Sequence, residues 1–165
     1  QCVRDLRIAQ IYEGTNGVQS QDLIGRKTIK CNGEFIAEYI QEIRDFANDL
    51  SADLNFIKDA TLDAAAEVES VTQYVLEAAS ENVEFSNSAA VDYLHAVGLL
   101  SFSYMFARIA NAAKDKDGEF YQNKLSLALY FVQRVLPELA VRIQKVKAGS
   151  EVIMNFSEDY FTNQA

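Results

Sequence analysis

The 165-residue sequence has little of what strands and turns require, with one proline and seven glycines. Folds built from strands and turns use both residues at frequent intervals. This chain instead runs for long stretches in alanine, leucine, glutamate and lysine, which favour helices. With 49% apolar and 24% charged residues, it has the composition of a globular domain. The composition therefore predicts an all-α fold.

The sequence also has few positive charges, and its net charge is −9. This balance disfavours nucleic acid and anionic membranes as partners, because both carry negative charge. The longest charge-free run, residues 93–107, is shorter than the roughly 20 apolar residues that cross a bilayer. It predicts a buried helix, and no membrane span is expected.

Cysteine and histidine are scarce as well. Cys2 and Cys31 are far apart in a chain large enough to fold without a disulfide, so we expect reduced thiols and a cytoplasmic location. His95, three residues after Asp92, is the single histidine. Di-iron sites in helical bundles need a second such pair, so no metal site is predicted.

Because the chain starts at Gln1 and not at methionine, we expect residue 1 to be a boundary within a longer protein.

Four amphipathic segments predict helices near residues 34–51, 61–81, 88–113 and 119–148, because apolar residues recur three and four positions apart. Thr61 is the expected N-cap of the second segment. The third contains only Asp92 and Arg108 as full charges, so we expect it to be buried on more than one side. Pro137 should kink the last helix and Gly149 should end it. Four helices with short links predict an up-down-up-down bundle.

The stretch "IYEGTNGVQ", residues 11–19, is the candidate for chemistry. On spacing alone, Glu13 is either a solvated carboxylate at a helix start, where the helix dipole favours it, or a carboxylate in a cleft. In the second interpretation Gly14 lets a ligand approach the backbone. Thr15 and Asn16 then offer a hydroxyl and an amide to a polar cofactor.

Residues 4–19, "RDLRIAQIYEGTNGVQ", resemble the carboxyl-terminal signature of the acyl-CoA dehydrogenases, in which a Tyr-Glu-Gly-Thr segment ends the catalytic α-helical domain. "SQDLIGRKTIK", residues 20–30, continues this likeness as the last helix of that domain. Residues from 33 onward, including "RVLPEL" and "GSEVIMNF", resemble the bundle appended to larger bacterial members. The resemblance implies two parts. Residues 1–32 would be a short remnant of the catalytic domain, and residues 33–165 a four-helix accessory domain.

In the family, the glutamate at the position of Glu13 removes the α proton of an acyl-CoA thioester while a hydride passes to FAD. The resemblance implies that Gly14 contacts the substrate. It places Thr15, Asn16, Gly17 and Gln19 along the FAD. Gly17 departs from the pattern, because relatives usually have a bulkier side chain there.

The family's flavin site also needs a β-domain and earlier helices, which precede the resembling segment. We therefore expect the intact enzyme to bind FAD and this chain alone not to retain it. The resemblance implies as partners the acyl-CoA substrate, the rest of the dehydrogenase chain and electron-transfer flavoprotein, and it implies a homo-oligomer. The alternative is a non-catalytic helical interaction or oligomerisation module in which Glu13 is merely solvated.

Overall fold

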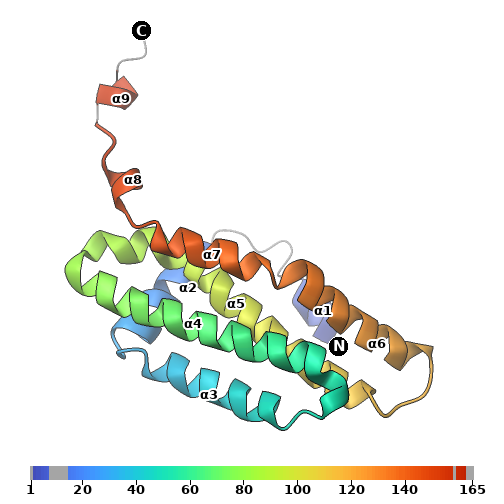
Figure 1. Ribbon diagram of the computed structural model, residues 1–165. Coiled ribbons are helices and arrows are strands. Elements are labelled where there is room, and N and C mark those ends of the chain that lie inside the picture. Colours follow the sequence, from blue (N-terminus) through green and yellow to red (C-terminus); the bar gives the residue numbers. More distant parts are fainter. Residues whose placement is uncertain (1, 8–14, 158, 163–165) are drawn as a thin grey trace.

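The computed structural model describes residues 2–7, 15–157 and 159–162, and the regular structure in these ranges is helical throughout (Figure 1). Three helices, α3 (Glu34–Asn48), α4 (Asn55–Glu81) and α5 (Val83–Ala113), follow one another, each antiparallel to the one before it. The fourth rod of the bundle consists of α6 (Glu119–Tyr130), the π-helix η4 (Phe131–Val135) and α7 (Glu138–Lys147). The predicted all-α, up-down-up-down bundle is confirmed.

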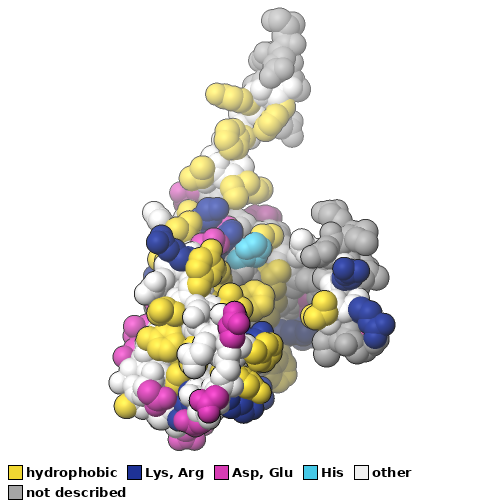
Figure 2. Space-filling view, turned by 90° about the vertical axis from the view of Figure 1, so that its right-hand side faces the viewer, with side chains coloured by type: hydrophobic (Ala, Val, Ile, Leu, Met, Phe, Trp, Pro, Cys, Tyr) yellow, Lys and Arg dark blue, Asp and Glu magenta, His cyan; other side chains and the backbone are white. Residues whose placement is uncertain are grey.

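Shorter elements come before, within and after the bundle in the sequence. Before it come α1 (Cys2–Asp5), α2 (Asn16–Gln21) and the π-helix η2 (Asp22–Ile29). A 3₁₀ turn, η3 (Ala52–Leu54), leads into α4. After α7, the short helices α8 (Glu151–Met154) and α9 (Asp159–Thr162) extend away from the bundle. Figure 2 shows hydrophobic side chains along this extended segment.

The start of α4 differs from the prediction, because Thr61 is not an N-cap. The helix begins six residues earlier, at Asn55, and Thr61 lies buried within it. Its hydroxyl is 2.7 Å from the Ser103 hydroxyl on α5, so its hydrogen bond joins two helices. Leu54 and Ile57 are also buried, and this packing extends the helix through the predicted loop.

The helix α5 also begins earlier than predicted, at Val83 instead of residue 88. Asn82 caps it, because its side chain accepts a hydrogen bond from the Glu84 N–H at 2.9 Å. One face of α5 is more exposed than its apolar sequence predicts, and Phe102 on it is 59% exposed. Val91 and Met105 lie at least two-fifths exposed on the same helix. The residues that the structure describes therefore bury this helix incompletely.

The break predicted at Pro137 is confirmed and takes a specific form. The helix before it widens into the π-turns of η4, and the Leu136 N–H donates to the Phe131 C=O at 2.9 Å. Pro137 is then the N-cap residue of α7, where its missing N–H costs nothing. At the other end of α7, Gly149 has a φ of 77° and ends the rod as predicted.

The core lies between the four rods and includes one residue from the preceding segment. It is formed mainly by aliphatic side chains together with several aromatic rings, and its fully buried members include Ile24, Ile40, Ile43, Val68, Val71, Val75, Tyr93, Leu100 and Val146. The Asp92–Arg142 ion pair, at 2.9 Å, joins α5 to α7 at the surface. No helix within the described residues is both long and apolar enough to cross a bilayer.

Candidate functional site

The candidate site falls at the start of α2. Glu13 and Gly14 lie outside the described residues, so Thr15 is the first residue of the site that the structure describes. Thr15 is half-buried and precedes the helix, and its C=O accepts from the Gln19 N–H at 2.8 Å. Asn16, Gly17 and Gln19 are exposed on the first turns of α2. The four predicted cofactor residues therefore lie on one exposed helix start.

Polar groups on this helix start are available to a ligand. Thr15 makes no side-chain capping bond to α2. A Cβ built on Gly17 would meet nothing within 4 Å, so this part of the backbone is open to close approach. Gln19 lines a surface hollow together with Val18, Gln21, Asp22 and Arg26. The helix start thus presents a hydroxyl, an amide and an open stretch of backbone, which can bind polar groups.

The opposite face of the same helix is anchored in the protein. Ser20, Ile24 and Thr28 are spaced four residues apart and are all buried. The Ser20 hydroxyl donates to the Gly17 C=O at 2.8 Å, so no buried donor is left open there. Because α2 continues into η2 without a break, the anchored and exposed faces belong to one rod.

The second half of this rod has π-helical geometry, which sequence patterns did not indicate. The Lys30 N–H donates to the Gly25 C=O at 2.9 Å, and the Gly33 N–H donates to the Thr28 C=O at 2.8 Å. Both bonds span five residues, as π-turns do. The wider turn is accompanied by a side-chain bond, because the Thr28 hydroxyl donates to the Leu23 C=O at 2.9 Å.

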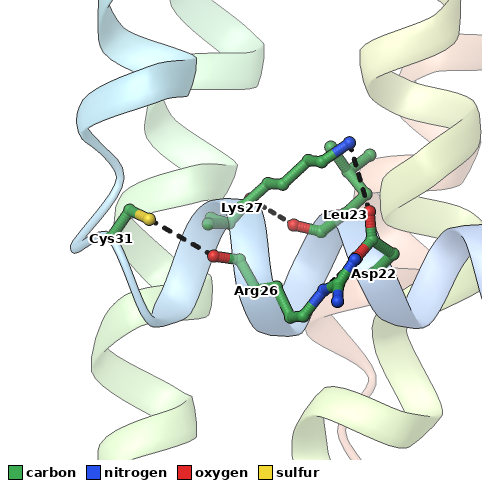
Figure 3. A network of polar contacts seen from close by, with 6 residues as sticks. Asp22, Leu23, Arg26, Lys27 and Cys31 are labelled. Carbon is green, nitrogen blue, oxygen red and sulfur yellow. Dashed lines mark hydrogen bonds and ion pairs between the residues drawn. The ribbon is translucent and has the colours of Figure 1, made fainter.

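Charges around Asp22 stabilise the outer surface of the rod (Figure 3). Asp22 bonds to Arg26, and its second carboxylate oxygen is 3.1 Å from the Lys27 ammonium. The hydrogen bond from Arg26, then that from Lys27, lowers the pKa of Asp22 below its ordinary value. Cys31 is a free thiol that donates to the Arg26 C=O at 3.3 Å. Asp22 is thus an ionised carboxylate whose charge is balanced by Arg26 and Lys27.

A buried polar chain connects this rod to the bundle, and sequence reasoning missed it. The Tyr93 hydroxyl on α5 lies 3.4 Å from the Thr28 hydroxyl and 2.9 Å from the Thr72 hydroxyl on α4. Tyr93 is fully buried, and burial raises the pKa of its phenol. The sequence predicts that Tyr93 lies on a buried helix, but it does not indicate which hydroxyl groups contact the Tyr93 side chain.

Most of the chain matches the model of a known family. Residues 39–157 match the model of the family described as "Acetyl-CoA dehydrogenase C-terminal like". The match covers most of the chain. The chain belongs to this family.

Curated relatives extend the likeness beyond the matched region. The chain is 28% identical to 3-methylmercaptopropionyl-CoA dehydrogenase of Ruegeria pomeroyi over 95% of its length. It is 25% identical to the broad-specificity linear acyl-CoA dehydrogenase FadE5 of Mycobacterium tuberculosis over 98%, and 25% identical to a butyryl-CoA dehydrogenase of Syntrophomonas wolfei over 96%. The chain spans 28%, 29% and 28% of these relatives, respectively. It therefore corresponds to less than a third of each.

Metal ligands were the other chemistry that the sequence raised. Among the residues that the structure describes, no group of three histidine, cysteine, aspartate or glutamate side chains is placed to hold a metal ion. His95 is exposed on α5, and the carboxylate of Asp92 is bound by Arg142.

Proposed function

We propose that this chain is the C-terminal part of a flavin-dependent acyl-CoA dehydrogenase, which oxidises the α,β bond of an acyl-CoA thioester. The observation that carries the proposal is the Tyr12-Glu13-Gly14-Thr15 segment, directly before a helix start whose polar groups are exposed. Membership of the family and relatives that are named as acyl-CoA dehydrogenases support it.

In this proposal each residue of the site has one task. The Glu13 carboxylate takes the α proton, which the thioester carbonyl makes acidic and the exclusion of water makes transferable. The Glu13 backbone N–H stabilises the charge that develops on the thioester oxygen. Gly14 admits the substrate, and Thr15, Asn16, Gly17 and Gln19 hold FAD. Bound FAD supplies the acceptor for the β hydride.

The proposal extends to the intact protein. Residues 1–32 end its catalytic domain and residues 33–165 form its accessory bundle, with an upstream β-domain completing the flavin site. The isolated chain then retains no FAD. The cytoplasmic enzyme is a homo-oligomer, and it passes its electrons to electron-transfer flavoprotein.

A second candidate is a non-catalytic interaction module, in which Glu13 is solvated. The exposed apolar residues Val91, Phe102 and Met105 on α5 favour it, because a face of this kind suits a partner helix.

Glu13→Gln in the intact dehydrogenase separates the two candidates. The variant keeps the shape of the side chain but removes the base, so FAD should stay bound while its reduction by acyl-CoA slows by about 10²–10⁴-fold. Anaerobic rapid mixing, monitored by flavin bleaching, measures this step apart from reoxidation. Glu38→Gln, at an exposed position on α3, is the matched control and should react like the parent. Flavin reduction at the parent's rate by Glu13→Gln would show that Glu13 is not the base.

A further inference from the structure

The polar chain through Tyr93 joins three separate parts of the fold. The Thr28 hydroxyl on η2 donates to the Leu23 C=O at 2.9 Å and shares the same hydrogen with the Tyr93 oxygen in a longer contact of 3.4 Å. The Thr72 hydroxyl on α4 donates to the Val68 C=O at 2.7 Å, which uses its only proton. Tyr93 is therefore the donor in its 2.9 Å bond to Thr72. All three hydroxyls therefore have a hydrogen-bond partner.

Packing around these hydroxyls holds the rod in the same place. Ile24, one turn before Thr28, is fully buried in the core cluster that contains Val71, Val75 and Tyr93. The rod formed by α2 and η2 contacts α3, α4 and α5, and Figure 3 shows it crossing the bundle helices. The bundle therefore determines where the rod lies and how it is rotated about its axis.

The exposed end of this rod is the candidate site. Asn16 and Thr28 are 12 residues apart along the continuous rod formed by α2 and η2. Thr15 immediately precedes the rod, and Glu13 is two residues before Thr15. A small rotation or slide of the rod at Thr28 therefore moves Asn16, which is three residues after the proposed base in the sequence.

We propose that Tyr93, with Thr72 and Thr28, positions the base-bearing segment, so that the accessory bundle contributes to the rate of the chemical step. This inference rests on the proposed function of Glu13. Tyr93 acts through the rod and touches neither substrate nor cofactor. The physical basis is that misplacing a reacting group by about 1 Å can slow a reaction by about 10²-fold.

The bundle contains a matched control for this proposal. Thr61 on α4 and Ser103 on α5 form another buried hydroxyl pair, 2.7 Å apart. Like the Tyr93–Thr72 bond, this pair joins α4 to α5. It includes no residue of the rod. Loss of the Ser103 hydroxyl should therefore destabilise the bundle without moving the proposed base.

The test compares Tyr93→Phe, Thr28→Val and Ser103→Ala in the intact dehydrogenase, below the unfolding temperature of every variant. We expect the limiting rate of flavin reduction at saturating acyl-CoA to fall by about 5–50-fold in Tyr93→Phe and Thr28→Val, within the range for a misplaced group. The dissociation constant of acyl-CoA should change less than twofold. Thr28→Ser restores the hydroxyl and should recover the rate, and Ser103→Ala should keep it.

Amide hydrogen exchange on the 165-residue chain provides a second measurement that needs no activity. Tyr93→Phe should speed exchange in residues 16–29 more than Ser103→Ala does. Equal effects of the two variants on both the rate and this exchange would overturn the positioning role.

Glu13→Gln separates this failure from failure of the proposed function. If Glu13→Gln keeps the parent's rate, the proposed base is wrong and the positioning role fails with it. If Glu13→Gln loses its rate but Tyr93→Phe and Thr28→Val do not, only the positioning role is wrong. If Tyr93 acts through Glu13, adding Tyr93→Phe to Glu13→Gln should slow flavin reduction no further.

Discussion

The chain enters its helical bundle through residues 16–33 and leaves it through residues 149–161, and the two segments differ sharply. Each meets the bundle at a glycine with a φ of 77°, Gly33 before α3 and Gly149 after α7. The entering segment then packs into the core, and Ile24 in it is 0% exposed. The leaving segment extends away from the bundle, and Ile153 in it is 58% exposed.

The spacing of the apolar residues explains this difference in burial better than their hydrophobicity does. The entering segment buries a residue at every fourth position, and its buried hydroxyls all have partners. The leaving segment places Val152, Ile153 and Met154 side by side, so they point in different directions around a short helix. Among its described side chains, the last buried one is that of Ser150, which accepts a hydrogen bond from the Asn82 amide at 3.0 Å. An apolar segment thus joins the core only when its apolar residues share one face.

Replacing Ile24 and Ile153 by alanine tests this comparison with the largest expected effect. Ile24→Ala leaves a cavity in the core and should lower the free energy of unfolding by about 2–5 kcal/mol. Ile153→Ala removes an exposed side chain and should change it by less than about 0.5 kcal/mol. Urea denaturation of the two variants measures both values. Similar losses would mean that the leaving segment packs in solution as firmly as the entering one.

Alanine at the two glycines sharpens the comparison, because both have a φ of 77° and their surroundings differ. A left-handed φ should cost either alanine about 1–2 kcal/mol of stability. At Gly33 the new Cβ would also lie 3.1 Å from the Leu76 Cδ1, whereas at Gly149 it meets nothing within 4 Å. Gly33→Ala should therefore lower the melting temperature further than Gly149→Ala. A larger loss at Gly149 would contradict the open surroundings of the leaving segment.

The smallest expected effect concerns the ion pairs of the entering segment. Because Arg26 and Lys27 lower the pKa of Asp22, its ionised form stabilises the folded chain at pH values above the ordinary value of 3.8. That contribution is lost as the pH falls through the lowered pKa. Asp22→Asn should therefore have a slightly lower melting temperature than the parent at pH 7. The decrease should be smaller than the decrease caused by Gly149→Ala.

Melting curves recorded between pH 7 and the acid range check this sign. The difference between the parent and Asp22→Asn should shrink toward acid. Asp63→Asn, at an exposed position on α4, serves as the control. A difference that grew toward acid would reverse the expected linkage.

Local patterns in the sequence accounted for most of the fold. Apolar residues recurring every three or four positions predicted the four rods, because a helix places such residues on one face. Pro137 and Gly149 predicted the break and the end of the last rod, because each acts on its own backbone. The "YEGT" segment likewise indicated the dehydrogenase family, and its assignment as the catalytic loop stays a prediction.

Tertiary structure alone decided what joins these parts. Thr61 is a suitable N-cap by local rules, yet its partner is Ser103, 42 positions away. Thr28 and Tyr93 are 65 positions apart, and no spacing rule connects them. The sequence by itself determined which segments are helical, since helices depend on neighbours within a few residues. Only the packed bundle decided which hydroxyls meet and which apolar faces stay open, because those contacts depend on how distant helices lie against one another.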